Sequence, residues 1–262
     1  MTKEKIKLYN QIIMDYNTGN FKLKDISLKY GIKYDTISKN IRRMGIITNP
    51  HGKISLNSNI FEKINTEEKA YWLGFLYADG SLYKNSKGHY RFELGLQQKD
   101  LNHIEKFKKF ISSKHKIHYR EATKSYRIIF NDSKFCNDLI NLGCVPKKSL
   151  ILKFPTEKQV PKELINHFIR GYFDGDGYLS KPPKELTLSL LGTKEFLNCL
   201  LIYIDSSKKI LKKDKRHINN TFNFTLCGNN ARNFLKFIYK DSTIFLERKK
   251  ELYNNLNLNN EK

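Results

Sequence analysis

The stretch YWLGFLYADG, from Tyr71 to Gly80, returns later in the chain as FIRGYFDGDG, from Phe168 to Gly177. Each copy is an apolar run that we expect to be helical, and each ends in Asp-Gly. Small residues four positions apart lie on one face of such a helix. They are Gly74 with Ala78 in the first copy and Gly171 with Gly175 in the second. We expect these two faces to touch, because small residues let helix backbones approach closely.

Packing the two helices side by side would bring Asp79 and Asp176 together at the carboxyl ends of both helices. Each of these ends already carries about half a negative charge from the aligned peptide dipoles. Two carboxylates in that position repel each other unless cations share them, and oxygen ligands suit Mg²⁺. The repeated pattern therefore predicts a divalent-cation site between the two copies.

Both stretches resemble the signature of LAGLIDADG homing endonucleases in their single-chain form, which contains two pseudo-symmetric copies of the motif. Asp176 follows Asp79 by 97 positions, and the segments after the two motifs also run in parallel. The residues that the resemblance assigns to the metal are Asp79, Asp176 and, through their carbonyl oxygens, Ala78 and Gly175. The same two aspartates would be catalytic. The sixth motif position is Tyr77 in the first copy and Asp174 in the second, so we assign Asp174 no catalytic role.

The composition predicts a nucleic-acid partner. The 262 residues leave room for two or three small domains, and 48 Lys and Arg against 26 Asp and Glu give a formal net charge of +22. This charge exceeds what solubility requires and favours a polyanion, for which double-stranded DNA is our first expectation. The sequence has no 18-residue apolar run and no signal peptide, so we expect no membrane partner and a cytoplasmic, nucleoid-associated protein. The spacing of the four cysteines predicts reduced thiols.

The first fifty residues resemble a helix-turn-helix unit. Ile26 and Tyr30 share one helical face, Gly31 supplies a tight turn, and Ile37 with Ile41 gives the next helix an apolar face. The opposite face of that next helix is basic and polar. The side chains that we expect to reach the major groove or its phosphates from this face are Lys33, Tyr34, Thr36, Lys39, Asn40 and Arg43.

Domain boundaries follow from breaks in these patterns. An earlier helix from about Lys3 to Tyr16 completes a three-helix domain over residues 1–48, and Asn49-Pro50 opens a linker over 49–63. The remainder divides into a first repeat over 64–152 and a second over 153–262. We expect the nuclease to lie wholly within residues from about 64 onward.

Both repeats follow the order helix, two strands, helix, two strands, helix. In the first repeat Phe92, Leu94 and Leu96 alternate with outward polar residues, as in a half-buried strand, and Leu186, Leu188 and Leu190 repeat this phase in the second. The fold class is therefore α+β: a three-helix unit followed by two pseudo-symmetric αββαββα repeats. The resemblance implies that their sheets form an antiparallel saddle for DNA, since a strand ribbon fits the major groove. The outward residues assigned to DNA are Arg91, Gln97, Lys116, Arg120, Arg127 and Lys181.

Basic residues lie near the cleavage site in the family, and the segment joining the repeats resembles the family too. The resemblance therefore makes Lys153 the first candidate to orient water or stabilise charge, with Lys158 as its alternative and Lys249 for the other strand. The histidines form no nuclease-like constellation. We expect His103, His115 and His118 at the surface.

Together these features predict a site-specific, Mg²⁺-dependent double-strand DNA endonuclease, acting as a monomer on a long site, with one aspartate serving each strand. Such an enzyme would suit a phage or an intron. One alternative is a transcription regulator of the same fold without catalysis, although unpaired carboxylates against DNA phosphate would cost it affinity. A second alternative is an RNA maturase acting on intron RNA. Met1 and the ending Asn259 to Lys262 do not match the termini of a protein-splicing domain, so we expect no such role.

Overall fold

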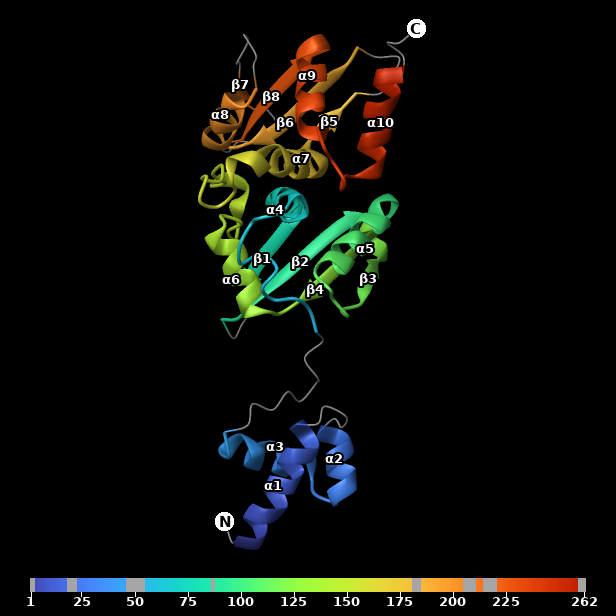
Figure 1. Cartoon of the computed structure of the whole chain (residues 1–262). Coiled ribbons are helices and arrows are strands. Elements are labelled where there is room, and N and C mark those ends of the chain that lie inside the picture. The colour runs from blue at the N-terminus through green and yellow to red at the C-terminus, as the bar shows by residue number, and fades with distance from the viewer. Residues whose placement is uncertain are drawn as a thin grey trace. The chain divides into compact units, whose positions relative to one another are not determined.

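The chain forms two compact units in a computed structural model, Met1–Ser55 and Leu56–Lys262 (Figure 1). The structure describes residues 3–17, 23–45, 55–85, 88–180, 185–204, 211–213 and 221–258. Among these residues, none of the helices combines the length and the apolarity that crossing a bilayer requires.

The N-terminal unit consists of three helices, which are α1 (Lys3–Asn17), α2 (Leu23–Tyr30) and α3 (Tyr34–Arg43). One small apolar core holds them together, and its buried members are Tyr9, Ile12, Leu23, Ile26, Ile37 and Ile41. Gly31 connects α2 to α3 with a φ of +61°, a left-handed conformation that glycine adopts without strain. The expected helices and their turn are thus present where the sequence pattern puts them.

The second unit contains two copies of the expected element order, and the α+β fold class is confirmed. The first copy comprises α4 (Glu67–Asp79), β1 (Gly80–Lys84), β2 (Tyr90–Gln97), α5 (Leu101–Phe110), β3 (Ile117–Arg120), β4 (Ser125–Phe130) and α6 (Ser133–Asn141). The second comprises α7 (Ile165–Asp176), β5 (Tyr178–Leu179), β6 (Thr187–Gly192), α8 (Lys194–Ile202), β7 (Leu211–Lys213), β8 (Phe222–Cys227) and α9 (Gly228–Tyr239). A further helix that the sequence pattern did not predict, α10 (Glu247–Leu258), follows the second copy.

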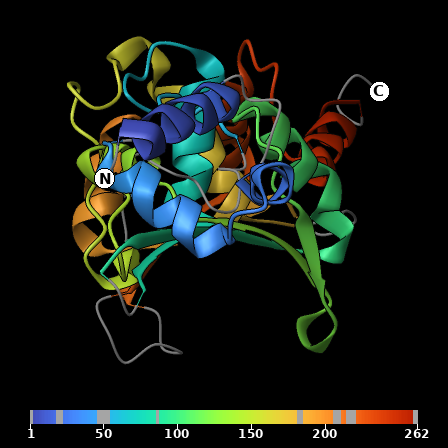
Figure 2. The ribbon, with the colours of Figure 1, turned by 90° about the horizontal axis from the view of Figure 1, so that it is seen from below.

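Each copy builds one antiparallel sheet, with strand orders β1-β2-β4-β3 and β5-β6-β8-β7. Phe92, Leu94 and Leu96 are buried beneath the helices, whereas Gln97 is exposed. Figure 2 shows the strands as an arch with helices on one side. The other face of the sheets is therefore free to present polar side chains.

Part of the expected linker belongs to the second unit. Phe61 is fully buried in its core, and Ser58 Oγ donates to Asp132 Oδ2 at 2.7 Å. Asp132 also caps α6, because its side chain accepts from the Phe135 amide. Residues 56–63 are thus anchored rather than a free spacer, while 46–54 lie outside the described residues.

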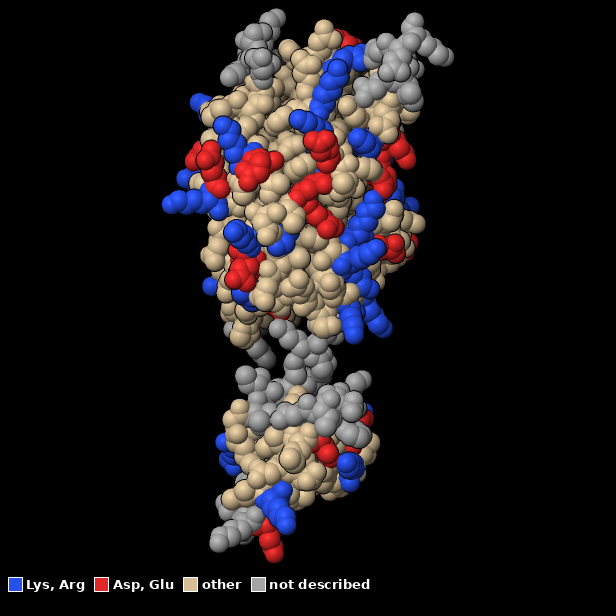
Figure 3. Space-filling view, in the orientation of Figure 1, with Lys and Arg blue, Asp and Glu red and all other residues tan. Residues whose placement is uncertain are grey.

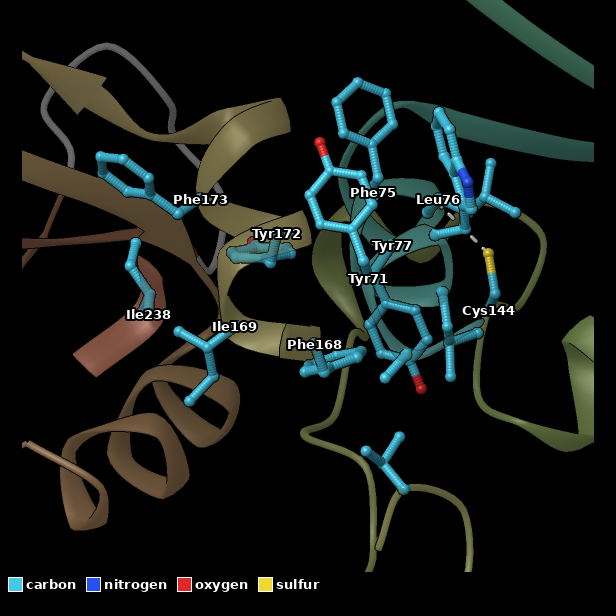
Figure 4. Packing of buried hydrophobic residues seen from close by; sticks show 14 of the residues in the cluster. Tyr71, Phe75, Leu76, Tyr77, Cys144, Phe168, Ile169, Tyr172, Phe173 and Ile238 are labelled. Carbon is cyan, nitrogen blue, oxygen red and sulfur yellow. Dashed lines mark hydrogen bonds between the residues drawn. The ribbon is translucent and has the colours of Figure 1, made fainter. Parts of the chain in front are cut away.

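Helices α4 and α7 pack against each other at the centre of the second unit (Figures 1 and 4). A β-carbon added at Gly74 would stand 1.9 Å from the carbonyl oxygen of Phe168, and one added at Gly171 would stand 1.9 Å from that of Tyr71. One added at Gly175 would stand 2.3 Å from the β-carbon of Ala78. The expected contact between the small faces is confirmed, and its backbones are too close for any side chain at the two central glycines.

Local signals set the start of α4. Thr66 has extended backbone angles, and its side chain accepts a hydrogen bond from the Lys69 amide at 3.3 Å. Such a cap contributes about 1 kcal/mol by satisfying an amide that has no partner within the helix. The register of the helix, and with it the place of Asp79 at its end, is therefore supported by a cap that the sequence predicted.

The expectation that His103 lies at the surface is wrong, since it is 3 % exposed. Its ring lies against Trp72 and Phe75, with centroids 4.8 and 4.6 Å apart. Burial lowers the pKa of His103 to about 3, which keeps the ring neutral at physiological pH. His103 precedes Phe107 by four residues, so helical spacing alone would have put it on the buried face. His115 is half-buried, and His118 is exposed as expected.

Replacing Gly171 by Ala should destabilise the second unit by about 3 kcal/mol or more, because the new methyl group would push α4 and α7 apart. The control is Gly95→Ala, where the new β-carbon would meet nothing closer than Arg127 Cβ at 3.7 Å. Urea unfolding of the full chain measures both variants. Equal stability of the two would contradict the close packing of the helices.

Candidate active site

Both motif helices leave their last turn in the same way. Gly80 follows α4 with φ −69° and ψ 141°, and Gly177 follows α7 with φ −75° and ψ 143°. A β-carbon at Gly80 would lie 2.6 Å from the Leu76 carbonyl oxygen, and one at Gly177 would lie 2.4 Å from that of Phe173. Close approach to the helix therefore requires glycine at both positions, and in both repeats a strand begins within two residues of the aspartate.

The helix contact brings the two aspartates to one place. Asp79 Oδ2 lies 3.2 Å from where a β-carbon on Gly175 would stand, so the first carboxylate faces the second helix. Asp79 is half-buried, and Asp176 is exposed as a residue although its carboxyl group is largely surrounded by protein. Burial, together with the charge of Asp176, raises the pKa of Asp79 to about 7, and burial also raises the pKa of Asp176. Bringing both carboxylates here in ionised form is costly without a compensating cation.

Two pockets open beside the aspartates. One, of about 280 Å³, is lined among others by Ala78, Lys148 and Asp176. The other, of about 370 Å³, is lined among others by Gly177 and Lys249. Each pocket therefore combines part of a motif end with a lysine from a distant segment.

The two lysines approach equivalent motif ends. Lys148 Nζ donates to the carbonyl oxygen of Gly80, and Lys249 Nζ donates to that of Gly177. Lys249 is 2 % exposed, and burial lowers its pKa to about 8. The sequence singled out Lys249 but missed Lys148, which follows α6 of the first repeat as Lys249 follows α9 of the second.

Lys153, our first lysine candidate, does not line either pocket among the described residues. Its side chain is 73 % exposed, and its Nζ lies 3.3 Å from Glu195 Oε1. The alternative Lys158 is exposed as well. Lys148, which is also close to the join between the repeats, lines the same pocket as Asp176.

The donor atoms at the motif ends suit a hard divalent cation. Two carboxylates and the neighbouring carbonyl groups of Ala78 and Gly175 supply only oxygen, the ligand type that Mg²⁺ and Ca²⁺ prefer. Within the described ranges there is no group of three or more His, Cys, Asp or Glu side chains placed to hold a metal. A cation here would therefore depend on main-chain oxygens and water for the rest of its shell, as Mg²⁺ commonly does.

The outward face of the first sheet carries the expected Arg91 and Arg127. Arg127 Nη1 lies 3.4 Å from Glu93 Oε1, and Tyr83 Oη donates to Glu93 Oε2 at 3.3 Å. Arg91 lies over the Tyr83 ring, with its guanidinium carbon 6.0 Å from the ring centroid. The other expected contacts on this repeat are exposed, namely Gln97, Lys116 and Arg120. Lys181 lies outside the described residues.

On α3, the expected contacts divide into two groups. Exposed side chains are those of Lys33, Thr36, Lys39 and Arg43. Tyr34 is half-buried and packs on the core of the N-terminal unit. The Asn40 amide donates to Tyr9 Oη at 2.7 Å, so it ties α3 to α1 rather than extending outward.

A comparison with solved structures agrees with this fold. The crystal structure of the I-LtrWI LAGLIDADG homing endonuclease bound to target DNA superposes with a TM-score of 0.51 and 13 % sequence identity, over 75 % of this chain and 92 % of that one. No family model matches the sequence.

Two curated relatives come from Methanocaldococcus jannaschii. A probable translation initiation factor IF-2 is 37 % identical over 103 residues, which cover 36 % of this chain and 9 % of the relative. A DNA polymerase is 28 % identical over 193 residues, covering 59 % of this chain and 11 % of the relative. This chain thus spans about a tenth of the length of either relative, and their names carry no activity over to it.

Divalent cations should raise the melting temperature of the full chain through Asp79 and Asp176. At a hundredfold excess over the dissociation constant, binding adds about 2.7 kcal/mol, and each kcal/mol is worth about 2–4 °C in a chain of this size. Asp79→Asn should abolish most of the shift, since it removes a charged ligand. Glu195→Gln, an exposed carboxylate elsewhere, should keep it. Thermal melts in MgCl₂ and in NaCl of equal ionic strength measure the effect, and an equal shift in both aspartate and control variants would remove the metal assignment.

Proposed function

Because the chain has the LAGLIDADG homing endonuclease fold, we propose that it is a site-specific, metal-dependent double-strand DNA endonuclease that acts as a monomer on a long site. The observation that carries this proposal is the pair Asp79 and Asp176 at the contact of α4 and α7, each close to a buried or half-buried lysine. A carboxylate pair whose ionisation is opposed by burial and repulsion is costly for the fold. Carboxylates with strongly shifted pKa values are concentrated at functional sites, where the shift serves the chemistry.

The two halves of the centre would serve one strand each. Asp79 and Asp176, with the carbonyl oxygens of Ala78 and Gly175, would hold Mg²⁺ or a similar ion. Such an ion supplies an activated water, a polarised phosphate and a stabilised leaving oxygen. Lys148 and Lys249 place positive charge beside the motif ends, where it would offset the charge that develops on the phosphate. In this role Lys148 replaces Lys153, which faces solvent.

The outward faces of the two sheets would bind DNA in the major groove. Arg91 and Arg127 are held beside Glu93 and Tyr83, so their guanidinium groups are partly oriented before DNA arrives. Arginine donates two parallel hydrogen bonds to guanine, which makes these two residues candidates for base reading. Gln97, Lys116, Arg120 and the undescribed Lys181 would add base and phosphate contacts. Figure 3 shows the side on which helices such as α9 lie in front of the strands, and there Lys and Arg are mixed with Asp and Glu rather than gathered into one patch.

The N-terminal unit would add affinity and lengthen the site. Lys33 at the N-cap of α3 and Thr36, Lys39 and Arg43 on the helix are exposed and would reach the groove or its phosphates. Tyr34 would contribute only through its exposed edge. All the candidate catalytic residues belong to the second unit, Leu56–Lys262, so removal of the N-terminal unit should affect binding rather than chemistry.

Asp176→Asn tests the chemistry. The full chain would first select a duplex from a random-sequence pool, and the duplex would then be labelled on both strands. The variant should bind it about as tightly as the wild type but fail to cut at least one strand in Mg²⁺, because it loses a metal ligand and keeps the fold. Glu195→Gln serves as the control and should cut both strands. Full double-strand cutting by Asp176→Asn would refute the assignment.

A chain starting at Leu56 tests the division of labour, since residues 56–63 pack on the second unit. It should still cut at low salt but bind more weakly. If the missing unit neutralises about three phosphates, the slope of log K against log salt should fall by about 2.7. The lost linkage should also cost about a hundredfold in affinity. Equal affinity of the two chains would contradict the binding role of α3, and binding without cutting would contradict the confinement of chemistry to residues 56–262.

A further inference from the structure

The segment that precedes Lys249 is fixed at both ends by buried or half-buried carboxylates. At one end, Glu67 of α4 accepts from the Thr243 amide at 2.6 Å, from the Thr243 hydroxyl at 2.7 Å and from the Ile244 amide at 3.3 Å. At the other end, the fully buried Asp174 of α7 accepts from the Leu246 amide at 2.7 Å. We call Glu67 and Asp174, with the residues that hold them, the carboxylate clamp.

Both carboxylates of the clamp have further partners that fix their own positions. Glu67 Oε1 lies 2.7 Å from Nη2 of Arg170, whose side chain is wholly buried and also donates to the Ile244 carbonyl oxygen at 2.9 Å. Asp174 accepts from the hydroxyl groups of Tyr71 at 2.9 Å and Tyr239 at 3.0 Å. Because Tyr71 gives its proton to Asp174, its oxygen accepts from Nε2 of His103 at 2.9 Å. The clamp therefore joins helices α4 and α5 of the first repeat to α7 and α9 of the second.

The clamp ends where the catalytic centre begins. The amide of Lys249 donates to the Leu246 carbonyl oxygen at 3.0 Å, so the residue that Asp174 holds is the one that starts the first turn of α10. Lys249 Nζ then donates to the carbonyl oxygens of Phe173, Asp174 and Gly177. The position of this ammonium group thus depends on the segment that the clamp fixes.

The first repeat lacks this arrangement. Its sixth motif position is Tyr77, whose hydroxyl donates to the Leu142 carbonyl oxygen. Lys148 Nζ donates to the Gly80 carbonyl oxygen, and within the described chain no further partner of this nitrogen is found. Leu150 and Ile151, which follow it, are 41 % and 59 % exposed. Lys148 is therefore less constrained than Lys249.

We infer that the carboxylate clamp positions Lys249 for one DNA strand only, so that loosening the clamp converts the double-strand endonuclease into an enzyme that nicks the other strand. The inference rests on the proposed function. Glu67 and Asp174 act through Lys249 and do not touch the DNA, which makes them positioning residues. A small displacement of a catalytic group costs up to about a hundredfold in rate. Lys148 and the motif end beside it keep their geometry, so cutting of the other strand continues.

The test compares rates on the two strands of a duplex that the full chain selects, each strand carrying its own label. Thr243→Val removes one hydroxyl bond to Glu67, and Asp174→Asn removes at least one acceptor in the clamp without changing shape. Both should slow cutting of the same strand by about tenfold to a hundredfold relative to the other, so that nicked duplex accumulates. Lys249→Met should affect that same strand, and Lys148→Met the opposite one.

Ser58→Ala is the matched control, because it also removes a 2.7 Å bond from a hydroxyl to a carboxylate within the same unit. It should leave the ratio of the two strand rates unchanged. An equal loss on both strands in Thr243→Val and Asp174→Asn, at unchanged DNA affinity, would overturn the inference while leaving the proposed function standing. Slower cutting of the strand that depends on Lys148, in place of the other strand, would overturn the inference too. A wild type that binds the duplex and cuts neither strand would instead overturn the proposed function and the inference together.

Discussion

The contact between the backbones of α4 and α7 is the constraint on which the second unit depends. Gly74 against Phe168 and Gly171 against Tyr71 leave no room for a β-carbon. This spacing puts both helix ends at one place and directs a strand outward from each. The aspartates, both pockets and the start of both sheets follow from that one contact. Aromatic side chains surround the helix pair, and the rings of Tyr77 and Phe168 meet edge to face with their centroids 5.0 Å apart (Figure 4).

The same contact creates an electrostatic problem at its carboxyl end. Two helix dipoles and two carboxylates bring negative charge together, and burial raises the pKa of both aspartates. Lys148 and Lys249 relieve part of it, since their charges lower the pKa of both groups. Both ammonium groups donate their hydrogen bonds to main-chain carbonyl oxygens, which leaves the carboxylate oxygens available to a ligand. The site is therefore only partly neutralised by the chain itself, as a cation site requires.

Sequence patterns predicted the parts of this structure that local rules control. The motif pair, the Thr66 cap and the inward phase of Phe92, Leu94 and Leu96 all follow from spacing and residue type. The role of Lys148 did not, because Lys147, Lys148 and Lys153 stand within seven positions and nothing in their types distinguishes them. Its distinction comes from a chain path that returns to Gly80, 68 positions away in sequence. The burial of Asp174 was likewise beyond local rules, since its partners Tyr71, Tyr239 and Leu246 lie far along the chain. The polar sequence of α10 gave no strong periodic signal.

The two repeats of the second unit need similar residues only where their motif helices pack against each other. Close packing demands small residues at the faces of α4 and α7, and extended glycines at their ends, so these positions are alike in both copies. The side chain at the sixth motif position also reaches the end of the third helix of its own repeat. There a bond from Tyr77 to the Leu142 carbonyl oxygen and a bond from Tyr239 to Asp174 join equivalent places with donor and acceptor exchanged. A hydrogen bond between these places is satisfied by either polarity, and in the second repeat the Asp174 carboxylate also accepts from the Leu246 amide. Asp174 therefore holds the residue before α10 in the second repeat. At the equivalent position of the first repeat, Tyr77 donates to the Leu142 carbonyl oxygen instead.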